Sequence, residues 1–158
     1  MPGLAHNSMS GDRPIIQLLE ENELNVSELY ALYAKKIPAK CTFWERLSQE
    51  EISHAAAIRN DSVGLDLKKS IVENNFSRGI IKYVMDFVLE EIQKTQNSSV
   101  THLDALNIAL RIERSMLEKK CFDMFMPTST TLKELFEKLN ADTEKHTEEL
   151  TEELRRIT

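Results

Sequence analysis

Apolar residues recur at every third or fourth position along four stretches of the chain, which is the spacing of one face of an α-helix. The first two predicted helices span about 14–36 and 42–60, and the short IPAKC segment between them requires an antiparallel return. The other two predicted helices span about 100–126 and 131–156. The pattern therefore predicts an all-α fold built from two antiparallel helical hairpins.

The helix starts and the connection between the hairpins carry signals of their own. Thr42 and Thr131 each stand three residues before a Glu, a spacing that fits capping boxes at the second and fourth helices. Residues 61–99 mix Gly, Asn, Asp and Ser with isolated apolar residues. We expect a long crossover there, containing a short helix at about 80–94. Two hairpins joined in this way form a four-helix bundle of the kind that holds metals in its core.

Composition and charge are consistent with one helical domain. The chain has 158 residues, 41% of them hydrophobic, with only four Gly and four Pro, and its net charge of −6 does not suggest a nucleic-acid surface. The most apolar segment, residues 80–92, is too short and too charged to span a bilayer. We expect a flexible tail over 1–13 and a bundle domain over 14–158, with no nucleic-acid or membrane partner.

The two cysteines, Cys41 and Cys121, lie far apart and form no CxxC pair. Their spacing excludes a cysteine-ligated zinc site or a rubredoxin-type iron site within this chain. One disulfide is possible, but a reduced, cytoplasmic setting is the simpler interpretation.

Five titratable residues interrupt the apolar faces of the predicted helices: Glu23, Glu51, His54, Glu113 and His146. The three-residue spacing of Glu51 and His54 places both side chains on the same side of a helix, within reach of one ion. Buried carboxylates without a partner cost several kcal/mol each or take up protons, and a divalent cation removes that penalty. Mixed oxygen and nitrogen ligands suit iron or manganese, and zinc is admissible.

The two hairpins also repeat one another. Each has one Glu on its first helix and a polar residue three positions before a His on its second helix. That polar residue is Glu51 in the first hairpin but Thr143 in the second. A carboxylate is therefore missing from the second half, unless Asp142 or Glu144 turns inward.

The segment LYALYAKKIPAKCTFWERLSQEEISHA, with Glu23 before it, resembles the first half of the rubrerythrin branch of the ferritin-like superfamily. The segments ALNIALRIERSMLE and LNADTEKHTEEL resemble its second half, so the resemblance covers roughly 14–60 and 100–156. It implies a ferritin-like four-helix bundle that binds two irons and reduces peroxide or activates oxygen. It also implies a separate electron donor.

In this interpretation Glu51 bridges the metals, Glu23 and Glu113 are carboxylate ligands, and His54 and His146 are terminal ligands. The resemblance leaves the crossover unmatched.

Other interpretations of these residues stay open. A lone Glu-x-x-His in a Glu-rich helical chain is weak support for a metal site, and His146 could be a core histidine that donates to Asp142. Tyr30 could be a relay near the metals or a packing residue. The alternative function is a non-catalytic metal-binding or scaffold bundle with a degenerate site, which Thr143 supports. Apolar residues in the crossover, such as Phe76, could form the interface of a homodimer, which we expect, but they could equally cover the bundle.

Overall fold

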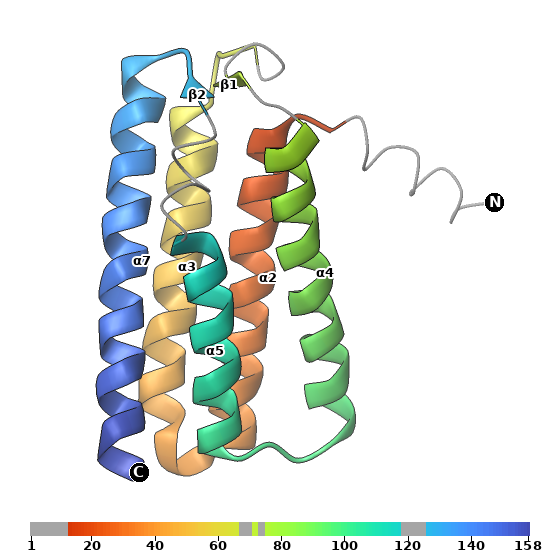
Figure 1. The fold of residues 1–158 in the computed structure, drawn as a ribbon, viewed down its shortest axis with the longest axis vertical. Coiled ribbons are helices and arrows are strands. Elements are labelled where there is room, and N and C mark those ends of the chain that lie inside the picture. Colours follow the sequence, from red (N-terminus) through yellow and green to blue (C-terminus); the bar gives the residue numbers. More distant parts are fainter. Residues whose placement is uncertain (1–12, 67–70, 73–74, 118–125) are drawn as a thin grey trace, which may run out of the picture.

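The computed structural model describes residues 13–66, 71–72, 75–117 and 126–158. These residues form an all-helical bundle in which the helices run along the long axis of the molecule (Figure 1). The helices are α2 (Ile15–Lys36), α3 (Cys41–Asp61), α4 (Asn75–Asn97), α5 (His102–Leu117) and α7 (Thr130–Ile157). None of these helices combines the length and the apolar composition that a membrane-spanning helix requires.

The chain passes up and down the bundle (Figure 1). Helix α2 descends, the 3-10 turn η1 (Pro38–Lys40) reverses the chain, and α3 returns antiparallel. Helix α4 descends beside α2, α5 rises, and α7 descends against α5 and α3. Helix α4 packs mainly against α2, and its buried side chains belong to the same hydrophobic core as those of α2, α3, α5 and α7.

Close packing of the first hairpin follows from small residues at its contact. Ser27 of α2 and Ser48 of α3 are both buried, and their hydroxyl oxygens lie 2.9 Å apart. The Ser48 hydroxyl also lies 2.9 Å from the Ser27 carbonyl oxygen, to which it can donate. Serine side chains this small let two helix backbones approach closely, while larger apolar residues such as Leu47 fill the core on either side.

Both predicted capping boxes are wrong. Helix α3 begins at Cys41 rather than after Thr42, and its first turn has no side-chain cap; Glu45 accepts a hydrogen bond from the Cys41 thiol instead. Helix α7 begins at Thr130, and its N-cap lies two residues before the predicted cap Thr131. Its cap is Ser129, whose hydroxyl accepts a hydrogen bond from a backbone N–H of the first turn.

The crossover differs from the prediction of a short helix. Helix α4 has 23 residues, and apolar side chains spaced by three or four positions bury one face of its central part. That buried face contains Ile81, Val84, Val88 and Ile92.

The predicted third helix does not reach Met126. Residues Met126–Pro127 form strand β2, which pairs antiparallel with strand β1 (Ile71–Val72). The predicted tail, apart from Arg13, and the segment around Cys121 lie outside the described residues.

An aromatic contact ties the two hairpins together near the start of α5. Trp44 of α3 is fully buried, and its indole N–H donates to Nδ1 of His102 at 3.1 Å. The Trp44 ring also packs edge-on against Tyr33 of α2. Because His102 and Trp44 are 58 positions apart, this hydrogen bond fixes the placement of the second hairpin against the first.

The hydrogen bond from Trp44 requires an unprotonated Nδ1 on His102. Burial lowers the pKa of His102 below its ordinary value of 6.5; the neighbouring Glu153 carboxylate raises it and the Lys40 amine lowers it. The unfolded chain therefore binds this proton more readily than the native state does. The contribution of His102 to the free energy of unfolding is present above about pH 6.5 and decreases as pH falls below it.

We predict a drop in the fluorescence of Trp44, the single tryptophan, as pH falls below 6.5 and an imidazolium forms beside the indole. The variant His102→Asn keeps a hydrogen-bond acceptor but does not titrate, so its emission should lose this step. Identical pH profiles for the two proteins, at unchanged helical circular dichroism, would contradict the contact.

Candidate metal centre

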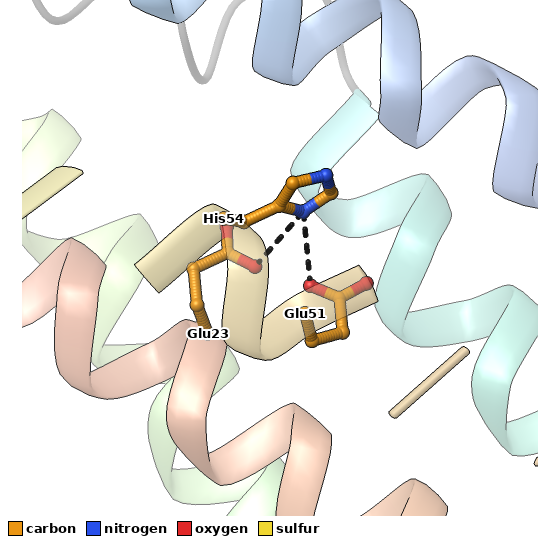
Figure 2. A group of neighbouring side chains, drawn as sticks. All are labelled: Glu23, Glu51 and His54. Atoms are coloured by element: carbon orange, nitrogen blue, oxygen red, sulfur yellow. Dashed lines mark hydrogen bonds and ion pairs between the residues drawn. The ribbon is translucent and has the colours of Figure 1, made fainter. Parts of the chain in front are cut away.

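Glu51, His54 and Glu23 meet inside the bundle. Figure 2 shows the His54 ring placed over two carboxylates, with Nδ1 3.4 Å from Glu51 Oε2 and 3.7 Å from Glu23 Oε2. All three residues are buried, and Glu51 is only 3% exposed. One ligand-type atom from each residue lies within 4.8 Å of the others, which is a separation that a single ion can span.

A second group forms on the other side of Glu51. Nδ1 of His146 lies 3.0 Å from Glu51 Oε1 and 3.4 Å from Glu113 Oε1, and both His146 and Glu113 are buried. Glu51 therefore belongs to both groups and turns one oxygen toward each imidazole. The structure brings together all five residues that the sequence predicts as ligands, while metal binding itself stays a prediction.

Apolar packing sets the direction of each of these side chains. On α2, Glu23 stands between Leu19 and Val26, both of which are buried in the core. On α3, Glu51 stands four residues after the buried Leu47. Positions three or four apart share one helix face, so the packing of the leucines and the valine carries the carboxylates inward.

The outer nitrogen of each imidazole pairs with a carboxylate of the opposite helix. Nε2 of His54 on α3 lies 3.1 Å from Asp142 Oδ2 on α7, and Nε2 of His146 on α7 lies 3.0 Å from Glu50 Oε2 on α3. An ionised carboxylate only accepts hydrogen bonds, so Nε2 carries the proton and the Nδ1 lone pair of a neutral ring faces inward. Metal-binding histidines are typically held by such a carboxylate.

Sequence reasoning missed Glu50 and misplaced Asp142. The structure contradicts a pairing of Asp142 with His146, and Glu144 is exposed rather than turned inward. A signal existed, because Glu50 and Asp142 each stand four residues before the histidine of their own helix. In the structure each histidine contacts the acid of the other helix instead.

Around the second group, two hydroxyls have hydrogen-bond partners and one buried ring nitrogen has none. Tyr30, fully buried, donates its hydroxyl to Glu113 Oε1 at 2.9 Å, and Thr143 donates its hydroxyl to the Leu139 carbonyl oxygen at 2.8 Å. In contrast, Nδ1 of His146 is buried without a hydrogen bond, although two carboxylates lie within 3.4 Å. A cation between this nitrogen and the carboxylates would satisfy all three groups, so the residues fit a bound metal.

Without metal, the two imidazoles supply the positive charge. Burial alone would lower the pKa of His54, but the Glu23 and Glu51 carboxylates raise it to about 10. For His146, Glu113 and Glu51 outweigh burial in the same way and raise the pKa to about 11.

The carboxylates of the first group respond differently to this environment. Burial, followed by the charge of Glu51, raises the pKa of Glu23 to about 8. Burial and Glu113 act to raise the pKa of Glu51, but its interactions with Glu23 and the two imidazoles lower it on balance. Glu51 is therefore the carboxylate that stays ionised.

Comparison of the chain with protein-family models, with curated proteins and with solved structures finds no match. The function is therefore inferred from the geometry and the chemistry of the site.

The pKa shifts predict how the stability of the metal-free protein depends on pH. Glu23, His54 and His146 have raised native pKa values, so the native state binds more protons than the unfolded chain. The stabilisation from the histidines is complete below their ordinary value of 6.5 and is lost toward about 10 and 11. The contribution of Glu23 is complete below 4.5 and is lost toward about 8.

We predict that the free energy of unfolding of the chelator-treated protein rises by at least about 1 kcal/mol from pH 9 to pH 6.5, since one pKa unit corresponds to ~1.4 kcal/mol. Denaturant titrations across this range measure it. At still lower pH the trend reverses, because Glu51 has a lowered pKa and loses its contribution on protonation. A midpoint that only falls as pH drops from 9 would contradict the charge arrangement.

A second prediction concerns Asp142, which holds the His54 ring from outside. Asp142→Ala should weaken metal binding by roughly 10- to 100-fold, because the ring loses the carboxylate that orients it. The matched control is Glu149→Ala: Glu149 is also a part-exposed acid, but it pairs with Arg46 rather than with a histidine. Competition with a chelating dye measures both affinities, and equal values for the two variants would contradict the role of Asp142.

Proposed function

We propose that this chain is a rubrerythrin-like non-haem iron protein that binds one or two metal ions in the bundle core and carries out oxidoreductase chemistry on peroxide or oxygen. The observation that carries the proposal is the position of Glu51, whose two oxygens face two separate Glu–His groups. Two hairpins joined by a crossover, with one buried carboxylate from each of α2 and α5, support a ferritin-like arrangement.

The ligand set favours iron or manganese and admits zinc, because it combines carboxylate oxygens with imidazole nitrogens. Three carboxylates beside two divalent cations leave a net positive site, which a small anion can neutralise. Thr143 stands where a fourth carboxylate would complete the second half. Each half of the proposed site therefore has one carboxylate of its own, one imidazole and a share of Glu51.

A bound pair of ferrous ions would supply the two electrons that reduce peroxide to two waters. The reaction also consumes two protons, and the chain holds protons at defined atoms around the site. Burial and the charges of Glu113 and Glu51 raise the pKa of Tyr30 well above its ordinary value, so its hydroxyl stays protonated against Glu113. Glu23, with a pKa raised to about 8, holds a proton near neutral pH in the metal-free site.

The second candidate function is a binding or scaffold bundle with a single ion. Thr143 favours it, because the threonine hydroxyl is a poor ligand and already donates to the Leu139 carbonyl oxygen. A single ion would occupy one of the two Glu–His groups, which share Glu51. A separate electron donor, a homodimer and a cytoplasmic location remain predictions from the sequence.

Metal stoichiometry tests the proposed function directly. Anaerobic calorimetric titration of the metal-free protein with ferrous ion should show saturable binding, and Glu51→Ala should lose at least about 100-fold in affinity, because it removes a carboxylate shared by both groups. Glu45→Ala, which removes an exposed carboxylate of the same helix, is the control. A parent protein that binds no iron, manganese or zinc, or a Glu51→Ala variant that binds as tightly as the parent, would contradict the proposal.

Thr143 provides a complementary prediction. Thr143→Glu should strengthen binding of the second ion on the His146 side, because it adds a carboxylate at the position equivalent to Glu51. Thr143→Val keeps the shape of the side chain without adding a ligand and should leave stoichiometry unchanged. Binding of one ion by the parent and two by Thr143→Glu would select the single-ion candidate for the natural protein.

A further inference from the structure

A pocket of about 160 Å³ opens between α3 and α7, beside the candidate metal centre. Ser53 and Ala57 of α3 form one wall, Leu135 and Leu139 of α7 form the other, and His54 and His146 lie at its inner side. Two further pockets, one near Gln17 and one near Asn107, contain none of the five candidate ligands. The α3–α7 pocket therefore differs from them in touching the site.

The inner wall of this pocket is formed by the two imidazoles and their outer carboxylates. The rings of His54 and His146 are stacked with centroids 5.6 Å apart, and their Nε2 atoms face Asp142 and Glu50. The two acid side chains are each 34% exposed, whereas His146 is 2% exposed. Solvent thus reaches the outer carboxylates, and the imidazole rings separate it from the inner ones.

The opposite side of the cluster is closed by buried side chains. Tyr30 is fully buried against Glu113, and Asn22 of α2 is 1% exposed and contacts the Met116 sulfur of α5. A solute arriving from the α2–α5 side would have to displace these packed groups. Movement of Glu50 or Asp142, which are part-exposed, requires a smaller rearrangement.

The wall of the pocket selects for size more than for charge. Glu50 and Asp142 are balanced by Lys138 and Lys145, which also line the pocket. Ala57 stands three residues after His54, on the same face of α3, and its methyl group leaves the space open. A larger side chain at this position would fill the approach to the His54 ring.

We propose that the α3–α7 pocket is the entrance through which metal ions and then hydrogen peroxide reach the buried cluster, with Ala57 and Ser53 setting its width. This inference rests on the proposed function, because it assigns the route to that same site. Ala57 and Ser53 touch the route and contribute no ligand atom to the five-residue cluster. Changing them should therefore alter rates without altering equilibrium affinity.

The test compares metal uptake by the metal-free parent and by Ala57→Phe in stopped-flow experiments with cobalt or zinc. Association and dissociation should both slow by on the order of tenfold in the variant, because entry then requires a conformational change. The dissociation constant should stay unchanged, since a narrowed entrance affects both directions equally. Oxidation of the iron-loaded variant by hydrogen peroxide should slow in parallel.

Two further variants keep this test decisive. Ser53→Phe narrows the same pocket from an exposed helix position, where a large side chain is tolerated if Ala57→Phe fails to fold. Gln17→Phe places the same ring at the pocket of α2 that lacks candidate ligands and should leave uptake unchanged.

The possible outcomes separate the entrance from the site. A parent that takes up no metal would contradict the proposed function itself. If the parent binds metal but Ala57→Phe and Ser53→Phe take it up as fast as Gln17→Phe, the proposed entrance is wrong and the proposed function stands. Slower association with an unchanged dissociation rate, and so a larger dissociation constant, would also contradict the proposed entrance. The substitution would then act on the metal site itself.

Discussion

The buried charge of Glu51 is the constraint on which the rest of the site depends. A carboxylate that is 3% exposed cannot remain ionised without cationic partners, and His54 and His146 each lie close to one of its two oxygens. Asp142 and Glu50 in turn balance the imidazoles and connect them to solvent. Metal ions and protons compete for the same inner nitrogens, so metal binding in this arrangement releases protons and weakens as pH falls.

The helical fold could be predicted from sequence because its main determinant is local. Apolar residues at intervals of three and four marked both hairpins, and the same residues pack in the core. The buried face of α4, from Ile81 to Ile92, lies within the predicted helix at about 80–94, but the polar residues at both ends of Asn75–Asn97 gave no helical pattern, so the full length of α4 was missed. The capping boxes failed at Thr42 and Thr131, because the start of a helix depends on backbone geometry that several neighbouring polar residues can satisfy.

The inner residues of the site could be predicted for the same reason. Glu51 and His54 are charged or polar at positions where the helix period requires apolar side chains, and that conflict is visible in one sequence. The outer pairs could not be predicted in this way. The partner of His54 is Asp142, 88 positions away, and this pairing depends on how α3 and α7 pack against each other rather than on spacing within either helix. The α3–α7 pocket depends on the same packing.

The most direct test of the central claim is the position of bound metal, measured by anomalous diffraction from crystals of the protein loaded anaerobically with iron or manganese. The account predicts anomalous peaks on either side of Glu51, one beside Glu23 and His54 and one beside Glu113 and His146. A single peak beside His54 would support the single-ion candidate. Peaks only at surface carboxylates, with Glu51 still paired to the two imidazoles, would contradict the account.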